Sequence, residues 1–579
     1  MGVFFLSKRD SSGLADNWWQ VQRRGGFGRC VPIDAGDWTL RLCGKLNGSG
    51  PHHVRRGADF AACTGVFFYR GRRLEAGLEL LLDEFDGGSF PWVECRGHYA
   101  VVLFKGGRLW LASDELGAYK IFRNIDGTRF SSSFGALRAT LSTAVPDEQG
   151  IYEYVFNGAT FGEKTLLRHI KQQRAGCLYS FGPSGPATMS APPVRHESNG
   201  YGSIDEAVDD YAERLRALFR VYGSGSMGFR TALSGGYDSR LILALLLDTG
   251  IRPDLFVYGN DDDPDVLVAK AIAEGEGLPL RHIHKDALAP KGAVSPEMAW
   301  IRFDSWKVDG LFDTGVDERD RCERASGGVD ILNGSGGECF RNFFYLRDRS
   351  YSPEEIVWSF YYRFDPSHVT DRFRRDAHVA ELAEDMRRSL PGNPRERRLG
   401  RDQVEALYPL FRVRYWTGRD VGLNQRFGPL LFPFVEPSVF AGTERIPIHE
   451  KDHGRFEARI LTRIAPKLAA YESSYGFSLA SDPPLKYRLK MGFTLWRPPF
   501  LRQFSYRIQS RIRGPAQVPG WFTEALEAAN LDPRLPRMRE YFHVERISDL
   551  DVLNRIATVE LVLQGGPWPL PDPHNATSA

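Results

Sequence analysis

The sequence predicts an α/β protein in two parts, a β-rich first third followed by alternating strands and helices. Short apolar or alternating runs, separated by turn residues, fill the chain up to about residue 182. A stretch rich in proline and glycine follows over 182–202 and has the composition of a linker. Beyond it, strand-like runs are separated by helix-length segments, which implies parallel strands joined by right-handed crossovers.

The composition argues against a nucleic-acid-binding protein and against a membrane-spanning one. The 579 residues carry a net charge of only +2, which gives no general attraction to nucleic acid or to anionic membranes. The longest aliphatic run, Leu241–Leu247, is far short of the roughly 20 residues that span a bilayer. The seven cysteines lack metal-binding spacing and are expected to be free thiols in a reducing compartment. We therefore expect a cytoplasmic protein with no nucleic-acid or membrane partner.

In the first part, Met1–Lys8 is expected to form a short edge strand and Leu74–Phe85 a helix with a broad apolar face. Further strands are expected at Thr64–Tyr69, Tyr99–Lys105, Arg108–Ala112 and Arg129–Ser133.

In the second part, an amphipathic helix at Ile204–Val221 precedes strand–helix alternation. The expected strands are Phe229–Leu233, Leu255–Tyr258, Leu280–Ile283 and Val329–Leu332, with helices ending near Gly250 and spanning Pro264–Glu276. From about residue 352 the chain is expected to be mainly helical, and its last residues, 568–579, to be disordered.

The sharpest motif is Ser-Gly-Gly-Tyr-Asp-Ser at 234–239, where a strand stops and a leucine-rich helix begins. The glycines permit a tight turn and close approach of a ligand. Helix N–H groups and the hydroxyls of Ser234 and Ser239 would form a cradle for phosphate. Asp238 would repel a bare anion, so it predicts Mg²⁺ between carboxylate and phosphate. No lysine follows the glycines, so this is not a Walker A loop; the alternative is a plain strand–turn–helix corner.

This motif resembles the pyrophosphate loop of the N-type ATP pyrophosphatases, and the likeness extends to the asparagine synthetase and β-lactam synthetase family. In that family a second glycine-rich loop brings another acid to the same magnesium. Asn-Gly-Ser-Gly-Gly-Glu at 333–338 looks like this loop, with Glu338 where the family usually has Asp. The resemblance implies ATP and Mg²⁺ as cofactors, with Asp238 and Glu338 as metal ligands.

The same resemblance implies the remaining site residues. Nucleotide contacts are expected from Leu233, Ser234, Gly235, Gly236, Asp238, Ser239, Val257, Tyr258, Asn333 and Gly334, and catalytic roles from Asp238, Glu338 and Ser335. Ser335 stands where asparagine synthetases carry Glu and β-lactam synthetases a catalytic Tyr, and a serine hydroxyl is a poor base at neutral pH. The family's late lysine is replaced at 474–477 by Ser-Tyr-Gly-Phe, so Lys451, Lys486 or Lys490 would have to supply that cation.

The N-terminal part is similar to the family's glutaminase-like domain, notably Tyr99–Phe104 followed by Asp114 and Gly117. The resemblance implies an N-terminal-nucleophile (Ntn)-hydrolase-like αββα sandwich over 1–185, a linker over 186–202, and an α/β adenine-nucleotide α-hydrolase-like (PP-loop) domain with helical additions over 203–567. An active glutaminase needs cysteine as residue 2. This chain has Gly2 and lacks the family's Asn-Gly-Glu near 65–70, so we expect no glutamine hydrolysis.

The expected function is an ATP-dependent ligase that adenylates a carboxylate, releases pyrophosphate and transfers the acyl group to an amine. The substrates would be a small-molecule or peptide carboxylate and an amine acceptor, and a homodimer or a biosynthetic partner protein is compatible with this function. Two alternatives stay open: a nucleotide-binding scaffold or partner protein without ligase activity, and an ammonia-dependent asparagine synthase, which Ser335 makes less favourable.

Three other polar features receive simpler interpretations. His282 and His284 alternate along a strand and share a face, but no third metal ligand is evident, which favours edge-strand histidines. The acidic run 261–263 is interpreted as a solvated loop, and Asp265 as a charge at a helix N-terminus.

Overall fold

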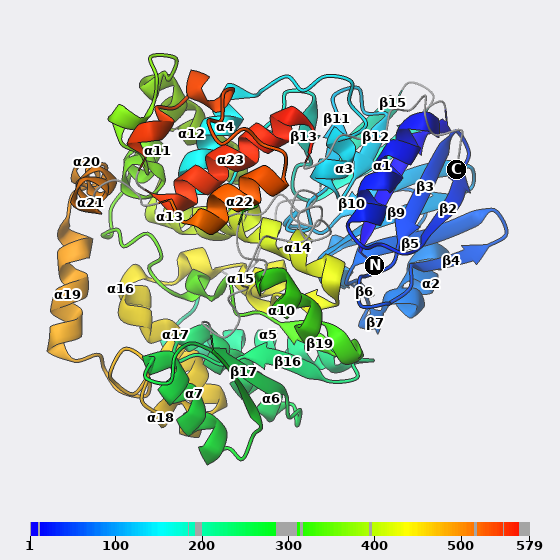
Figure 1. Cartoon of the computed structure of the whole chain (residues 1–579). Coiled ribbons are helices and arrows are strands. Elements are labelled where there is room, and N and C mark those ends of the chain that lie inside the picture. Colours follow the sequence, from blue (N-terminus) through cyan, green and yellow to red (C-terminus); the bar gives the residue numbers. More distant parts are fainter. Residues whose placement is uncertain are drawn as a thin grey trace.

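The computed structural model describes residues 2–9, 12–182, 185–190, 200–284, 310–312, 316–392, 396–513, 518–547 and 549–566. It is a mixed α/β structure, as predicted, in which a β-rich part lies beside a parallel sheet and a mainly helical region (Figure 1). The tail predicted to be disordered, 568–579, lies outside the described residues.

The N-terminal part contains two six-stranded antiparallel sheets. The first has the order β13-β11-β12-β1-β3-β2 and is built from β1 (Val3–Lys8), β2 (Cys30–Ala35), β3 (Trp38–Cys43), β11 (Phe122–Asn124), β12 (Arg129–Ser131) and β13 (Ile170–Gln172). The second has the order β15-β14-β10-β9-β5-β4 and is built from β4 (His52–Arg56), β5 (Asp59–Gly65), β9 (Tyr99–Lys105), β10 (Arg108–Ser113), β14 (Cys177–Gly182) and β15 (Gly185–Ser190). A small sheet joins β6 (Phe68–Tyr69), β7 (Arg72–Arg73) and β8 (Cys95–Arg96).

The two large sheets pack face to face, with helices on their outer faces. Trp38 of β3 contacts Phe181 of β14 with ring centroids 4.6 Å apart. On the outer face of the first sheet, Phe5 stacks on Trp18 of α1 (Ser12–Arg24) at 5.2 Å, and α3 (Phe134–Arg138) lies alongside α1. Helix α2 (Leu74–Glu84) covers β4 and β5 of the second sheet. The layers therefore run helix, sheet, sheet, helix.

Three predictions made from the sequence differ from the observed strands of the N-terminal part. Strand β1 is not at an edge, because it pairs with both β12 and β3; its residues Val3–Leu6 are all buried, as expected of a strand covered on both faces. The strand predicted at Thr64–Tyr69 divides into β5 and β6 after Gly65, whose φ is 90°. Residues 186–190, predicted as linker, extend the sheet as part of β15, which pairs with β14.

The second part is built on a parallel five-stranded sheet of order β18-β17-β16-β19-β20. Its elements are α5 (Ile204–Gly223), β16 (Phe229–Ala232), α6 (Tyr237–Asp248), β17 (Asp254–Tyr258), α7 (Pro264–Gly275), β18 (Leu280–Ile283), β19 (Asp330–Leu332) and β20 (Leu430–Leu431). Because the sheet is parallel, the chain leaves β16, β17 and β19 at one common edge. The sequence prediction missed β20, two residues within a largely helical region.

The other described helices extend from this sheet to the first part. They are α4 (Glu148–Asn157), α10 (Val316–Arg324), α11 (Pro353–Ile356), α12 (Arg375–Ser389), α13 (Arg401–Leu407), α14 (Gly418–Phe427), α15 (Pro437–Phe440), α16 (Ile448–Lys451), α17 (Arg455–Ile464), α18 (Pro466–Ala470), α19 (Leu485–Trp496), α20 (Pro499–Arg502), α21 (Ser505–Arg513), α22 (Gly520–Ala528) and α23 (Leu550–Gln564). Helix α17 packs on α5 and α6, and α23 packs on α4. No described helix has the length and apolar character needed to traverse a lipid bilayer.

A buried ion pair connects the two parts. Arg73, which precedes α2, donates two hydrogen bonds to Asp330 at 2.6 and 2.5 Å. The Asp330 side chain, at the start of β19, is only 1% exposed. One hydrophobic core also runs without interruption from the outer face of the first sheet into the helical region. The two parts therefore share both polar and apolar contacts.

Replacing Asp330 by asparagine should destabilise the protein strongly, because it leaves the Arg73 guanidinium, on a side chain only 13% exposed, without its counter-charge. We expect a loss of about 3–5 kcal/mol, measured as lowered resistance to chemical and thermal unfolding. Asp254→Asn is the matched control, since Asp254 begins β17 of the same sheet and its side chain is 60% exposed in its pair with Arg230. Equal losses for the two variants would contradict this account of the junction.

Candidate functional site

The loop 234–239 connects β16 to α6 at the carboxyl edge of the parallel sheet. The Ser234 N–H donates to the Ser239 hydroxyl at 3.0 Å, and the two hydroxyls lie 2.9 Å apart. Gly236 is the N-cap residue of α6 and, among the described residues, no side chain caps this helix. The first-turn N–H groups of α6 are thus available to an anion.

Two neighbours from other elements hold this loop in place. The Gly235 N–H donates to the Asp265 carboxylate of α7 at 2.9 Å. Asp265 is therefore more than a charge at a helix start, because it fastens the loop to the next strand–helix unit. On the other side, Ser474 approaches Gly235 so closely that a Cβ at 235 would lie 2.6 Å from the Ser474 Cβ. Glycine at 235 is required by this contact.

The second glycine-rich loop follows β19 and packs directly against the first. The Asn333 side chain accepts the Ser335 N–H at 2.8 Å and so turns the chain toward the short 3₁₀ helix Gly337–Phe340. A Cβ at Gly337 would lie 1.9 Å from the Asp238 Oδ1, and one at Gly334 would lie 3.0 Å from the Asp238 Cβ. Any side chain at 337 would displace Asp238, so the glycines bring the two loops together.

Three carboxylates converge on one guanidinium between these loops. The Arg341 Nη2 donates to both Asp238 oxygens at 2.9 and 2.8 Å, and it lies 3.8 Å from the Glu338 Oε1. The Arg341 Nε lies 3.1 Å from the Glu457 Oε2. Asp238 and Glu338 were predicted to meet, and the structure brings them to the same nitrogen atom. Sequence reasoning missed Arg341 and Glu457, since neither belongs to a motif.

One positive charge cannot balance three ionised carboxylates. Burial raises the pKa of Asp238, and Glu338 raises it further, against the effect of Arg341. Burial and the nearby Asp238 raise the pKa of Glu457 well above its usual range. Burial acts to lower the pKa of Arg341, but Asp238 and Glu457 outweigh it and hold the guanidinium charged. The cluster would therefore accept a further cation.

The donor set suits Mg²⁺, which prefers carboxylate oxygens. Asp238 and Glu338 are the residues that would hold it, with Glu457 behind them. The three acids of this cluster are not drawn as closely together as ligands around a bound ion. Among the described residues, ligand atoms from three side chains lie within 4.8 Å of one another in a different group, which consists of Asp261, His282 and His284.

A small pocket of about 90 Å³ adjoins the cluster. Its lining residues are Tyr237, Arg341, Asn342, Tyr345, Lys451, Asp452, His453, Gly454, Tyr475, Tyr487, Met491 and Leu495. Of the three lysines considered from the sequence, Lys451 lies here, 1% exposed and 2.7 Å from the Glu405 Oε2. Lys486 and Lys490 are exposed on α19.

The other predicted site residues lie around the sheet edge. Leu233 and Val257 are buried, and the Leu233 N–H donates to the Phe256 carbonyl at 2.8 Å, joining β16 to β17. The Tyr258 hydroxyl donates to Asp320, an interaction separate from the two loops. Ser335 is half-buried at the turn after β19.

The position expected of a glutaminase nucleophile is closed. Gly2 is buried, and a Cβ there would lie 2.5 Å from the Phe27 ring and 2.6 Å from the Gly44 carbonyl oxygen. A cysteine side chain would have to displace both. The segment near 65–70, where the sequence resemblance would place a glutamine clamp, contains Val66 and Phe67, which are buried in the apolar core.

Comparisons with known proteins add little. No protein-family model and no curated protein matches the chain. Among solved structures, the allosteric regulatory enzyme of purine biosynthesis is 10% identical, with 51% of this chain and 82% of that chain covered and a TM-score of 0.24. Glutamine phosphoribosylpyrophosphate (PRPP) amidotransferase from B. subtilis, complexed with ADP and GMP, is 11% identical, with 59% and 77% covered and a TM-score of 0.22. Scores this low carry no argument about fold or function.

The Glu457→Gln variant should lose less stability than the wild type as pH rises. A carboxyl whose folded pKa is raised above its ordinary value of 4.5 binds more protons in the folded state, so its contribution to stability falls above that pH. Glutamine at 457 removes this decline, and the stability difference between variant and wild type should shift in favour of the variant between pH 5 and 8.

Urea unfolding at several pH values measures this difference. Glu405→Gln is the control, since Glu405 is a buried carboxylate matched by Lys451 and should be costly to replace throughout the range. A stability difference for Glu457→Gln that does not change with pH would contradict the assignment.

Proposed function

We propose that this protein is an ATP-dependent carbon–nitrogen ligase that adenylates a carboxylate, releases pyrophosphate and transfers the acyl group to an amine. The observation that carries the proposal is the meeting of Asp238 and Glu338 on one Arg341 nitrogen, beside a pocket. The two acids follow neighbouring parallel strands, β16 and β19, and each stands in or after a glycine-rich loop.

Pyrophosphate would lie at the start of α6. The uncapped N–H groups there, with the hydroxyls of Ser234 and Ser239, offer hydrogen bonds to phosphate oxygens. Asp238 and Glu338 would hold Mg²⁺, which when bound neutralises charge on the departing pyrophosphate. Leu233 and Val257, at the ends of adjacent strands, would contact adenosine.

The adjoining pocket would hold the acyl group and the amine. Lys451 is the lysine best placed to supply the cation that the family's late segment lacks here, because it lines the pocket and Glu405 fixes its ammonium. A buried ammonium stabilises oxyanion charge as the amine attacks the acyl carbon. Tyr237, Tyr475 and Tyr487 give the pocket aromatic walls suited to a substrate with apolar parts.

The amine would not come from glutamine hydrolysed in the N-terminal part. The nucleophile position holds Gly2, where there is no room for a longer side chain. The acceptor would then be free ammonia or, as we favour, an amine belonging to a second substrate or to the carboxylate substrate itself.

Pyrophosphate release from MgATP, measured across a panel of carboxylates that includes aspartate, tests the proposal. Asp238→Asn should lower carboxylate-stimulated release at least about 100-fold, since it removes charge at the reacting phosphates. Asp248→Asn is the matched control: it changes the last residue of the same helix, where Asp248 pairs with Arg216, and should retain activity.

Other outcomes identify the alternatives. ATP binding without release on any carboxylate, with or without added amines, would overturn the ligase and favour a nucleotide-binding scaffold. Release stimulated by aspartate alone, with asparagine formed from ammonia, would instead identify an asparagine synthase.

A further inference from the structure

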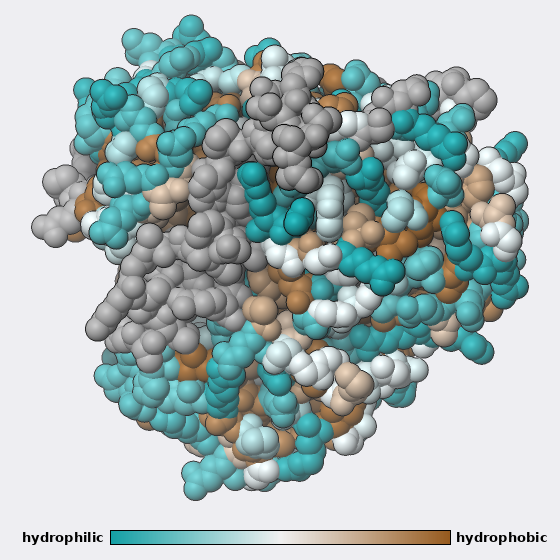
Figure 2. Space-filling view, turned by 45° about the vertical axis from the view of Figure 1, so that its right-hand side comes forward, coloured by the Kyte–Doolittle hydropathy of each residue, from teal (hydrophilic) through white to brown (hydrophobic). Residues whose placement is uncertain are grey.

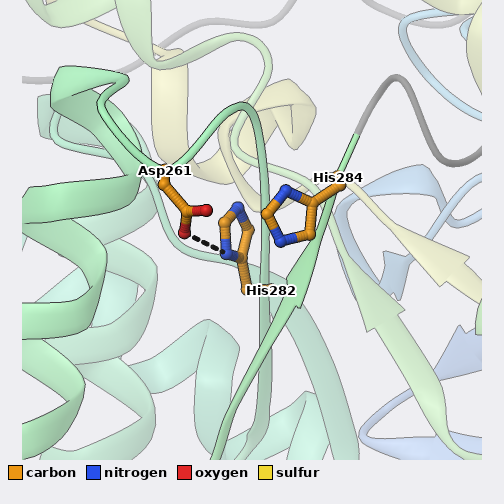
Figure 3. Close-up of side chains that lie close together, drawn as sticks. All are labelled: Asp261, His282 and His284. Carbon is orange, nitrogen blue, oxygen red and sulfur yellow. Dashed lines mark ion pairs between the residues drawn. The ribbon is translucent and has the colours of Figure 1, made fainter.

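A second cluster of ligand-type side chains lies at the same edge of the parallel sheet. Asp261 is in the loop after β17, and His282 and His284 come from β18 and the residue after it. Figure 3 shows the two imidazole rings side by side, with the Asp261 carboxylate pointing toward His282. One ligand atom from each of the three residues lies within 4.8 Å of the others. The sequence interpretation, which found no third ligand, missed Asp261 because it precedes the histidines by a whole helix.

The hydrogen bond of His282 determines which of its nitrogens is free. The His282 Nε2 lies 3.0 Å from the Gly259 carbonyl oxygen, which can only accept, so Nε2 carries the proton. The other ring nitrogen, Nδ1, faces the Asp261 Oδ1 3.6 Å away, so a single metal ion between them would contact both atoms. A histidine held by a backbone carbonyl, with its other nitrogen free, is the usual arrangement of a metal-binding imidazole.

The two imidazoles are close enough to share one ion. The rings of His282 and His284 lie 4.0 Å apart, and one nitrogen of each lies within 4.8 Å of the other and of an Asp261 oxygen. Asp261 already attracts one positive charge, since the Lys270 Nζ of α7 lies 2.9 Å from its Oδ1. The Lys270 side chain is 44% exposed, so it can turn into solvent when an ion takes that oxygen.

We propose that Asp261, His282 and His284 bind a divalent transition-metal ion of the Zn²⁺ type. Two imidazole nitrogens and one carboxylate oxygen suit such an ion better than Mg²⁺, and they leave a fourth position open to water or a ligand. The ion would join β18 to the loop from which α7 begins. Because Asp265 of α7 holds the Gly235 N–H, the ion would stiffen the support of the 234–239 loop. The proposal does not depend on the ligase activity.

Titration of the metal-stripped full-length protein with Zn²⁺, and with Co²⁺ as an absorbing substitute, tests the site. We expect one high-affinity ion and a Co²⁺ absorption band typical of four or five ligands. His284→Ala and Asp261→Asn should each weaken Zn²⁺ affinity at least about tenfold. His449→Ala is the control, since that exposed histidine lies on α16 and should bind as the wild type does. The Asp261 side chain is 74% exposed, so its variant should fold normally.

A wild type that binds no Zn²⁺, an unchanged affinity in both site variants, or a Co²⁺ spectrum of the hydrated ion would overturn the site. Pyrophosphate release plays no part in these measurements, so the site and the proposed ligase can fail separately.

An independent observation concerns the segment 485–513, which spans α19, α20 and α21. It contains eight Lys and Arg residues and no Asp or Glu, although the whole chain has a net charge of only +2. Figure 1 shows α19 along the outer edge of the molecule, away from the two six-stranded sheets and from the parallel sheet. Basic charge is thus concentrated on one peripheral segment.

The same segment exposes most of the large apolar side chains on the described surface. Of sixteen such exposed residues, nine lie here: Leu485, Leu489, Phe493, Trp496, Phe500, Leu501, Phe504, Ile508 and Ile512. On α19, Tyr487, Met491 and Leu495 face the pocket, whereas Phe493 and Trp496 are 81% and 67% exposed. A helix that is apolar on two faces needs a surface to pack against on each of them, and one face of α19 has none among the described residues. On the coloured part of the face seen in Figure 2, hydrophilic residues alternate with small apolar patches.

We infer that segment 485–513 docks on an anionic lipid surface. Basic residues interleaved with Trp, Phe and Leu are the pattern of helices that lie in the membrane–water interface. A second copy of the chain would bring the same positive charges and be repelled. The sequence expectation of no membrane partner rested on the net charge of the whole chain and on the absence of a membrane-spanning run, and neither observation concerns this segment. The pocket, which α19 lines with its other face, would then open close to the lipid.

Co-sedimentation of the full chain with phosphatidylglycerol and phosphatidylcholine vesicles tests this surface. Binding should be specific to the anionic vesicles and should weaken with salt. The double variant Phe493→Glu, Trp496→Glu should bind at least about tenfold less. Val93→Glu with Met227→Glu is the control, because those residues are 74% and 76% exposed elsewhere. Failure to bind anionic vesicles, equal binding to both lipids, or equal loss in both double variants would overturn the inference.

Discussion

The parallel pairing of β16 with β17 and β19 is the constraint on which the candidate site depends. Thr231 pairs with Leu255 on one side and Leu332 on the other, so three strands end at nearly the same level. The loops that follow them are then neighbours in space, although they lie up to a hundred residues apart in the chain. Every polar group of the candidate site, and the histidine cluster as well, stands at this edge or is packed against it.

Electrostatics explains why the two glycine-rich loops can approach so closely. Bringing Asp238 and Glu338 together without a cation would be costly in a partly buried site. Arg341 supplies that cation, and the buried Glu457 adds a third acid on its far side. The glycines at 334 and 337 remove the steric obstacle, and Arg341 removes the electrostatic one. The result is an acidic site held together by a guanidinium, with capacity for more positive charge.

The N-terminal part supports the parallel sheet. Gly2 is enclosed by Phe27 and Gly44, and the region of the expected glutamine clamp is apolar core. What this part contributes is support: Arg73 neutralises Asp330 at the start of β19, and Lys45 donates to the backbone carbonyl and side chain of Gln425 at 2.7 and 2.9 Å. Through these contacts the N-terminal part anchors β19, an interior strand of the parallel sheet.

The sequence by itself determined the local events: where β16 stops, where α6 begins, and that a strand follows each crossover helix, because turn residues and apolar periodicity are local signals. It also singled out Asp238 and Glu338, since glycine-rich loops mark close backbone approach. It did not reveal Arg341 among the acids, Asp265 on Gly235, Asp261 beside the histidines, or the central position of β1. Those depend on strand order and on side chains that meet across long stretches of chain, and only the tertiary structure decides such encounters.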